Sequence, residues 1–300
     1  MKNKNTFAES LATNMLTYNG YVTRILELAV TRFKWINLPI EIDERYLELG
    51  LIQRGSMCFF KDEDLKDELI PDGYLIMKYI STGIFDVYNN PTKIQSFANN
   101  GYIKDLTNKD SCIIYNNYTR TPNISIIQLY AKRLYDLDCT IEVNARAQKT
   151  PVLIKSTEGQ RLTLKNIYKE YDGNAPVIYG SKDLDVQGLT VLRTDAPYNA
   201  DKLYQLKINL WNEVLTYLGI DNITVNKKER LISDEVNRSL GGTIANRGSH
   251  LLARQNAKDK INKMFGLNID VVPMSEYLIK TDTSDNDSED NDEMGVVDNE

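Results

Sequence analysis

A glycine-rich stretch in the last quarter of the chain has the residue types that bind phosphates. Residues 239–250 read SLGGTIANRGSH and contain three glycines, one arginine, no acidic residue and the only histidine of the chain. Glycine lets backbone N–H groups approach an anion closely, and a nearby cation adds attraction. The stretch could therefore be the nucleotide-binding loop of an enzyme, a hinge, or a flexible loop directed at a larger polyanion.

The known nucleotide-binding patterns do not fit this stretch. A P-loop needs a Lys-Ser/Thr pair directly after its last glycine, whereas Gly248 is followed by Ser249 and His250. No G-x-G-x-x-G fingerprint of a dinucleotide fold occurs either. The sequence therefore predicts no nucleotide cofactor.

Residues for catalysis and for metal binding are equally sparse. A Ser-His-Asp or Cys-His site would have to use His250, which we expect near the start of a final helix. The three cysteines are far apart, so no zinc site with close ligand pairs is formed. Pro71-Asp72 is not followed by the Asp/Glu-x-Lys of a nuclease core. We predict no catalytic residue, no metal and no cofactor; a DNA-processing enzyme with an unrecognised acidic site is the alternative.

The basic residues are more suggestive. Those that stand out are Arg193 and Lys202 around the turn TDAPY, Lys227, Lys228 and Arg230 before the glycine-rich stretch, and Arg238 and Arg247 at its ends. On one chain they are ordinary surface charges. In a symmetric ring each becomes a belt of positive charge, which attracts a phosphate backbone without reading its sequence.

The overall composition is that of a globular chain, with 42% hydrophobic and 26% charged residues. No apolar run reaches the ~18 residues that span a bilayer, and the first ten residues lack an apolar signal core. We therefore expect neither a membrane segment nor secretion. The few cysteines favour a reducing, cytoplasmic folding environment.

Acidic residues are concentrated at the C-terminus. Residues 281–300 contain nine of the 42 acids and none of the 36 bases, so the rest of the chain is slightly basic although the formal net charge is -6. A block of like charges with few apolar residues cannot bury a core. We predict a disordered acidic tail from residue 276 onward.

Long helices must position the basic residues. Apolar residues spaced by three and four predict helices over residues 8–35, 123–149 and 201–218, with a further helix over 251–265. At about 1.5 Å per residue the first would be roughly 40 Å long. Gly219 and Gly266 follow two of these segments and are predicted to cap them. Such stripes need partners, and self-association is the simplest way to bury them.

Shorter β-like runs lie between the helices. Residues 57–60, 74–77, 84–88 and 112–115 predict a small mixed or barrel-like sheet, and residues 150–198 predict a compact α/β insert with strands at 152–154, 177–179 and 189–192 and a helix at 164–171. A closing strand is predicted over 267–273. The fold class is therefore α+β.

Several ungapped blocks resemble one known family. They are NARAQKTPVLI (144–154), LKNIYKEYDGNAPVI (164–178), RTDAPYNADKL (193–203), WNEVLTYLGI (211–220) and KKERLISDEV (227–236), with INLPIEI, DVYNN, IIYNN and KINKMFGLNIDV in support. In this order and spacing they are similar to the portal proteins of small short-tailed phages, also called upper collars or head–tail connectors. The resemblance covers about residues 30–272.

The resemblance implies a virion protein that forms a twelve-fold ring at one capsid vertex, assembled in the host cytoplasm. Double-stranded DNA would pass through the ring, and its other partners would be the major capsid protein, the packaging ATPase and the lower collar or tail proteins. Only Lys2 and Lys4 stand where some relatives have a denser basic N-terminus, so a packaging RNA is not carried over.

The resemblance also implies a domain plan. The first stem helix falls within 1–35, the wing within 36–122 and 220–275, the other stem helices at 123–149 and 199–219, and the clip at 150–198. Arg193 and Lys202 match the channel-lining bases of the family, with an arginine at 193 where relatives carry lysine. We predict that the cluster of Lys227, Lys228 and Arg230 lines the channel as well. A channel loop at 237–249 would include Arg238, Gly241, Gly242, Asn246, Arg247 and Gly248. The competing interpretation is a non-catalytic DNA-binding scaffold that remains monomeric.

Overall fold

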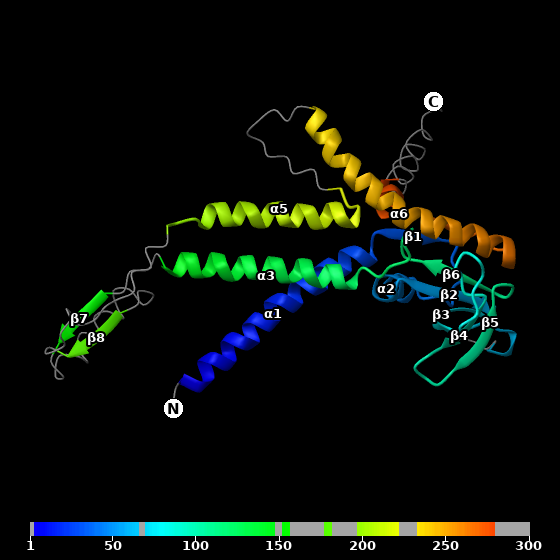
Figure 1. Cartoon of the computed structure of the whole chain (residues 1–300), viewed down its shortest axis with the longest axis horizontal. Helices are drawn as coiled ribbons and strands as arrows, with labels where there is room; N and C mark the ends of the chain where they lie inside the picture. The colour runs from blue at the N-terminus through cyan, green and yellow to red at the C-terminus, as the bar shows by residue number, and fades with distance from the viewer. Residues whose placement is uncertain are drawn as a thin grey trace, which may run out of the picture. The chain divides into compact units, whose positions relative to one another are not determined.

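The computed structural model describes residues 3–65, 70–147, 152–156, 177–181, 197–221 and 233–279 (Figure 1). Its contacts divide the chain into two compact units. Unit 1 comprises Met1–Lys132 and Asn212–Glu300, and unit 2 comprises Arg133–Trp211. Two of the helices, α3 (Ile124–Ala147) and α5 (Ala200–Leu218), begin in one unit and end in the other.

Unit 1 contains a five-stranded antiparallel sheet in the order β5-β4-β3-β2-β6. Its strands are β2 (Ser56–Lys61), β3 (Tyr74–Ser81), β4 (Lys93–Phe97), β5 (Ile103–Thr107) and β6 (Ser111–Tyr115). A short 3-10 turn, Glu63–Leu65, follows β2. The first half of β3 pairs with β2 and its second half with β4, so β3 joins the β2–β6 part of the sheet to the β4–β5 part.

The expected barrel-like closure is not found. Among the described strands β5 and β6 are the two edges of the sheet, and no pairing joins them. The short turn between them is held by its own hydrogen bonds. The Thr107 amide donates to Asp110 Oδ1 (2.6 Å), and Ser111 Oγ donates to the Thr107 carbonyl (2.6 Å). Residues at the end of β5 and along β6 line a groove.

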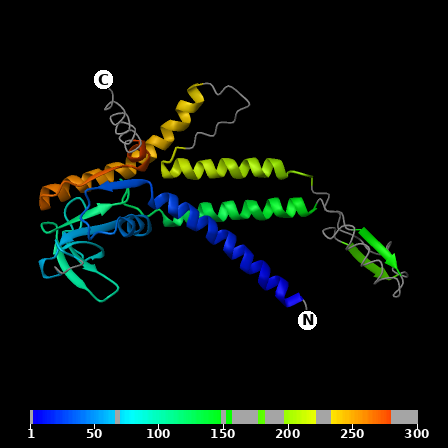
Figure 2. The same cartoon turned by 180° about the vertical axis from the view of Figure 1, so that it is seen from behind.

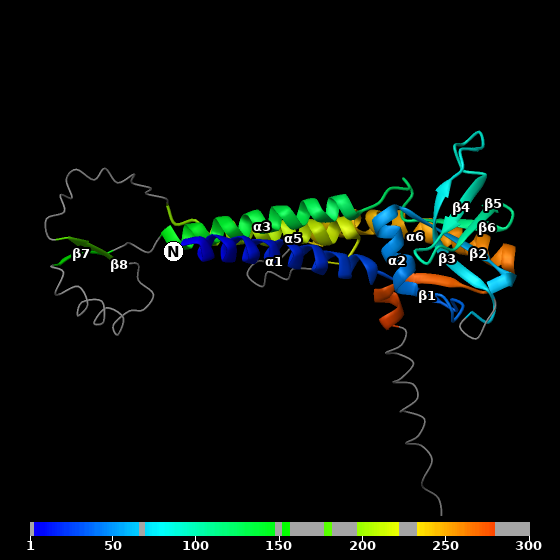
Figure 3. The same ribbon diagram turned by 90° about the horizontal axis from the view of Figure 1, so that it is seen from below.

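The main hydrophobic core lies between this sheet and two helices, α2 (Glu44–Arg54) and α6 (Ser233–Phe265). Met57 and Phe59 of β2 and Leu47 and Leu51 of α2 are fully buried in it. From the other end of the chain α6 contributes Ile261. Figure 3 shows α6 running along the sheet. Distant parts of the sequence thus share one core.

The first helix, α1 (Asn3–Val30), begins and ends five residues earlier than predicted. Residues 33–36 form strand β1 (Phe33–Ile36), which pairs antiparallel with β9 (Asp270–Pro273). The prediction was wrong here because the apolar spacing of Phe33 and Ile36 also suits a helix. In the structure Phe33 and Trp35 alternate inward, and pairing with β9 supplies the backbone hydrogen bonds.

Unit 2 holds the C-terminal half of α3, the N-terminal half of α5 and two parallel strands, β7 (Val152–Ser156) and β8 (Val177–Ser181). The two helices run side by side and antiparallel (Figures 1 and 2). Lys207 Nζ lies 2.5 Å from Asp138 Oδ1. The Asn144 side chain bonds to the Pro197 carbonyl and the Asn199 amide.

Most predicted elements are confirmed where the structure describes them. The structure contains helices α3 and α5 and strands β2, β3, β6, β7, β8 and β9. Gly219 (φ 73°) and Gly266 (φ 69°) are left-handed helix caps, as predicted. The predicted helix at 164–171 and strand at 189–192 lie outside the described residues. Residues 84–88 form a turn with a single bridge between Phe85 and Pro91, and α2, β4 and β5 were not predicted.

The disordered tail was predicted to begin at residue 276, which is too early. Residues 274–279 are helical, so the segment from residue 276 is not entirely irregular. The acidic residues from 281 onward lie outside the described residues.

Candidate nucleic-acid interface

The predicted channel cations fall mostly outside the described residues. Arg193, Lys227, Lys228 and Arg230 belong to this group. Lys202 is described, and it lies exposed in the first turn of α5. The described residues therefore do not show whether these cations lie together, and their role in lining a channel stays a prediction.

The predicted channel loop is a helix. Residues 237–249 all lie within α6, so the loop conformation and the helix start near Leu251 were both wrong. Each glycine destabilises a helix by roughly 1 kcal/mol relative to alanine, so the three glycines led to the prediction of a loop. Gly241, Gly242 and Gly248 nevertheless have no positive φ. Tertiary bonds from α6 override their propensity.

These tertiary bonds attach α6 to the end of α5. Asn246 Nδ2 donates to the Thr216 carbonyl at 2.9 Å. Arg247 Nε donates to the Gly219 carbonyl at 2.8 Å, and Arg247 Nη2 pairs with Asp221 Oδ1 at 2.6 Å. Arg247 therefore acts as a structural anchor in this conformation, although the sequence suggested that it meets passing phosphates. Arg238 lies in α6, but its side chain is not described.

Gly219 lets the two helices approach. A Cβ built on Gly219 would lie 2.6 Å from the Arg247 backbone nitrogen, which cannot move without shifting α6. Gly219 also has a left-handed backbone, which residues with a side chain rarely adopt. Glycine is therefore required here for two separate reasons.

We expect Gly219→Ala to lower the free energy of unfolding by about 2–5 kcal/mol, the sum of the left-handed penalty and of overpacking. Gly266→Ala is the matched control, because Gly266 has the same left-handed backbone but open space around its Cβ position. The control should lose only about 1–2 kcal/mol. Chemical denaturation of both variants measures the difference, and equal losses would contradict the close contact.

The exposed face of this helical segment carries little bulk and little charge. Gly241, Gly242 and Gly248 are exposed, and Ile244 is the large apolar side chain between them. Thr243 faces inward and is buried. A bare helix face of this kind can lie close to a passing polymer without gripping it.

Alanine substitution tests the helical conformation. Gly241→Ala and Gly248→Ala should each raise the free energy of unfolding by up to about 1 kcal/mol, because each removes a helix-breaking glycine from a site with free space around it. Denaturant titration gives the values. A loss of stability in both variants would instead favour the loop of the sequence-based prediction.

A buried ion pair fixes α6 against the rest of unit 1. The side chains of Arg254 and Glu48 are 0% and 1% exposed, and two parallel bonds of 2.6 and 2.8 Å join them. Trp35 Nε1 donates to the same carboxylate at 2.8 Å. Arg254 also donates to the Asn116 carbonyl and lies 4.5 Å from the centre of the Phe33 ring. Helix α6, helix α2, strand β1 and the end of β6 thus meet at one guanidinium.

The only histidine belongs to this cluster. His250 lies in the middle of α6, not near a helix start, and is buried with Nδ1 2.9 Å from the Asn116 carbonyl oxygen. Burial, followed by the charges of Arg32 and Arg254, lowers the pKa of His250 to about 3. A neutral, buried imidazole bonded to a backbone carbonyl has a structural role.

Asparagines extend the cluster to α3 and α5. Asn116 bonds to Asn123 and to the Thr121 carbonyl, and Asn123 in turn bonds to Tyr217 of α5. The Tyr217 ring packs 5.8 Å from that of Tyr130. The bases of α3 and α5 in unit 1 are therefore tied to the same polar network as α6.

Arg32 forms a second buried cation beside this network. Its Nε donates to the Ala29 carbonyl and its Nη1 to the Leu218 carbonyl, at 2.9 and 2.8 Å. Burial and the neighbouring Arg254 lower the pKa of Arg32. This arginine joins the end of α1 to the end of α5.

The described residues contain no site for metal chemistry. No group of three or more His, Cys, Asp or Glu side chains among them could hold an ion. In the part of the chain that is described, helices are also too short or too polar to cross a bilayer. The described residues form a junction of packed helices, and the exposed face of α6 there carries little bulk and little charge.

Comparison with known families decides the identity. The family Phage Connector (GP10) matches residues 5–278. The chain belongs to the phage connector family. This connector is thus a structural component of the phage particle at the junction of head and tail, in agreement with the resemblance seen in the sequence.

Solved structures support the fold of the connector. A chain from the portal and tail of native bacteriophage P68 matches it with a TM-score of 0.52 and 16% sequence identity, over 97% of each chain. A chain from the virion of a native gene transfer agent particle matches with a TM-score of 0.40 and 11% identity, over 93% of this chain and 86% of that one. The second similarity is too weak to carry an argument.

Sequence reasoning missed the residues that organise the connector's junction. Arg254, Glu48 and Arg32 lie in segments that read as ordinary charged surface, and their partners are up to 206 positions away. One signal was available, because Arg254 follows Leu251 and precedes Ile261 on the apolar side of the predicted last helix. A base on an apolar face needs a buried acid.

Proposed function

We propose that the connector assembles into a closed ring, of twelve subunits as in the family it resembles, around a channel for double-stranded DNA. The match to the connector family over residues 5–278 carries the proposal. The fold shared with a chain from the portal and tail of phage P68 supports it. The ring would sit at one capsid vertex, where DNA enters during packaging and leaves during ejection.

Exposed apolar side chains on the long helices support self-association. In unit 1 these are Met15 and Leu16 of α1 and Ile126 and Leu129 of α3, and in unit 2 they are Val143, Tyr204 and Leu206. Large exposed apolar side chains along helices are typical of surfaces that meet another protein. We assign the stem to these helices, the clip to 150–198 and the wing to 36–122 with 220–275.

The DNA-facing surface would combine cations that contact phosphates weakly with the exposed, glycine-rich face of α6. Arg193, Lys202, Lys227, Lys228 and Arg230 are the proposed channel cations, repeated in each subunit. The N-terminal half of α6 takes the place of the predicted channel loop. Non-specific phosphate contacts that break easily suit a polymer that must slide.

The other proposed partners follow from the position of a connector in the particle. They are the major capsid protein, the packaging ATPase, and lower collar or tail proteins. The connector itself would carry out no catalysis and bind no cofactor or metal. A monomeric DNA-binding scaffold and a DNA-processing enzyme are the alternatives.

Electron microscopy of the purified connector tests the proposal. Closed rings with a central opening, and a native mass equal to a whole multiple of the subunit mass of 34.3 kDa, are the expected results. A stable monomer at micromolar concentration would favour the scaffold. Metal-dependent cleavage of DNA by the pure protein would favour the enzyme.

Neutralising two channel cations should change DNA contact and leave assembly intact. For Arg193→Gln with Lys202→Gln we expect normal rings, and a plot of log DNA affinity against log salt whose slope is shallower by about 2 or more. Lys93→Gln with Lys109→Gln is the control with the same charge change at exposed positions, one in β4 and one in the turn after β5. Loss of rings in the first variant alone would place these side chains at a subunit contact.

A further inference from the structure

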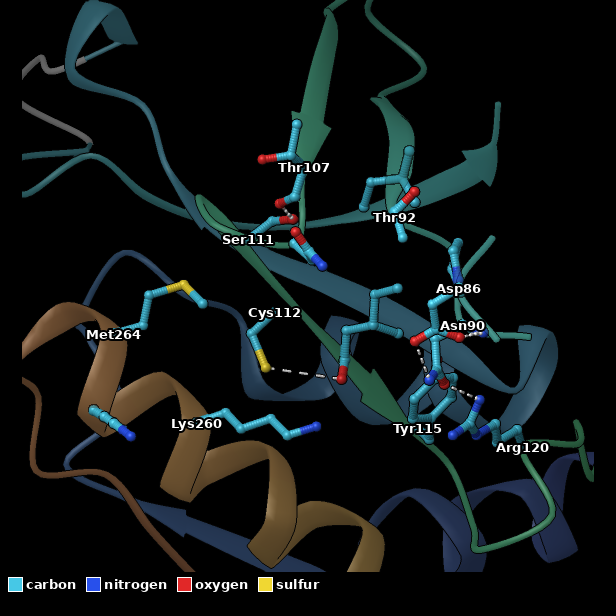
Figure 4. Close-up of a pocket in the computed structure, with 15 residues that line it drawn as sticks. Asp86, Asn90, Thr92, Thr107, Ser111, Cys112, Tyr115, Arg120, Lys260 and Met264 are labelled. Atoms are coloured by element: carbon cyan, nitrogen blue, oxygen red, sulfur yellow. Dashed lines mark hydrogen bonds between the residues drawn. The ribbon is translucent and has the colours of Figure 1, made fainter. Parts of the chain in front are cut away.

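A groove runs between the open edge of the sheet and α6. Its volume is about 570 Å³. The lining comes from the turn 86–92, the β4 and β5 ends, strand β6, the loop after β6 that carries Arg120, and the last turns of α6 (Figure 4). We call it the basic groove. It plays no part in the proposed channel.

The charges of the basic groove are unbalanced. Its cations are Arg120, Lys260 and Lys263, and its only acid is Asp86. The Asp86 carboxylate already accepts bonds from the amides of Tyr88 and Asn90 and from the Asn90 side chain. These bonds lower the pKa of Asp86 and occupy its oxygens. Neither lysine forms an ion pair with any described residue, so the groove has a net positive charge.

One of the cations, Arg120, is also held in position. Arg120 donates from Nη1 to Asn90 Oδ1 at 2.6 Å and lies 4.4 Å from the centre of the Tyr115 ring. Figure 4 shows Lys260 extending from α6 toward the strand end where Tyr115 and Arg120 lie. Side chains of Thr107 and Ser111 add hydroxyl groups to the wall. The surroundings suit carboxylates on an extended chain, and the volume is too small for a DNA duplex.

The sequence supplies a complementary segment. Residues 281–300 contain nine acids and no base, and no other part of the proposed function uses them. The described chain ends at Ile279 within unit 1, to which the groove also belongs. Twenty-one further residues span at most about 70 Å. A compact unit of this size has a radius of gyration of about 17 Å, so its whole surface is within reach.

We infer that residues 281–300 bind the basic groove of the same chain. The carboxylates meet Arg120, Lys260 and Lys263, and the apolar walls of Ile94, Pro91 and Met264 accept the aliphatic parts of the segment. Binding neutralises a basic surface that would otherwise attract DNA away from the channel. This inference does not depend on ring formation or on the channel assignment.

Photocrosslinking of the full-length connector tests the inference. A benzophenone amino acid at position 290 is irradiated at low salt, and the crosslinked peptides are identified by mass spectrometry. We expect crosslinks to residues 86–120 and 256–264. Their yield should fall roughly fivefold in the double variant Lys260→Glu with Lys263→Glu, because exposed ion pairs are individually weak and the groove loses two of its cations. The yield should also fall in 0.5 M salt, because salt screens exposed ion pairs.

Two controls distinguish the outcomes. Lys93→Glu with Lys109→Glu reverses two exposed lysines outside the groove and should leave the yield unchanged. A mixture of heavy-isotope and light chains separates binding within a chain from binding between copies. Mixed heavy–light crosslinks, crosslinks scattered over the surface, or a yield insensitive to the groove lysines would each overturn the inference.

Discussion

Replacing Arg254 with methionine is expected to lower the free energy of unfolding of the connector by about 3–5 kcal/mol, the usual loss when one partner of a buried ion pair is removed. The Glu48 carboxylate would be left 1% exposed without the cation that is hydrogen-bonded to it. The Asn116 carbonyl and the Phe33 ring would lose the same guanidinium. Thermal and chemical denaturation measure the effect.

A double variant and a surface control make this test specific. Arg254→Met with Glu48→Leu removes both charges, so it should recover a large part of the loss. Arg45→Met breaks the exposed pair with Asp43, whose side chains are 69% and 52% exposed, and should change stability by less than about 1 kcal/mol. A double variant as unstable as Arg254→Met would show that packing, and not the unpaired acid, dominates.

Charged substitutions on the exposed apolar face of α3 should abolish the ring. Ile126 and Leu129 are 37% and 43% exposed and lie one turn apart. If a neighbouring subunit covers them, Ile126→Asp with Leu129→Asp removes at least about 2–3 kcal/mol of apolar burial from each interface. A closed ring would lose this stabilisation at every contact between subunits. Native mass spectrometry should show monomers, and circular dichroism should remain unchanged.

The matched control lies on the same helix. Ser125 and Gln128 are exposed polar residues beside the two apolar ones, and Ser125→Asp with Gln128→Asp adds the same charge without removing apolar surface. This variant should form rings. Rings from the apolar variant would exclude this part of α3 from the subunit contact, whereas monomers from both would indicate that charge alone prevents assembly.

The sequence determined the elements whose signals are local. Helices α3 and α5 follow their apolar spacing to within a few residues, and Gly219 and Gly266 are left-handed caps as their positions after a helix required. The connector family was recognisable because several blocks in fixed order carry more information than any one motif. The same blocks defined the candidate channel residues, which the described parts of the structure leave largely untested.

Only the tertiary structure decided the rest. Residues 33–36 have a spacing that suits helix or strand, and pairing with β9 selects the strand. Residues 237–249 have glycines that favour a loop, yet Asn246 and Arg247 bond to the end of α5 and hold a helix. Arg254 finds Glu48 across 206 positions. In each case the deciding energy comes from partners distant in the sequence, which local propensity does not contain.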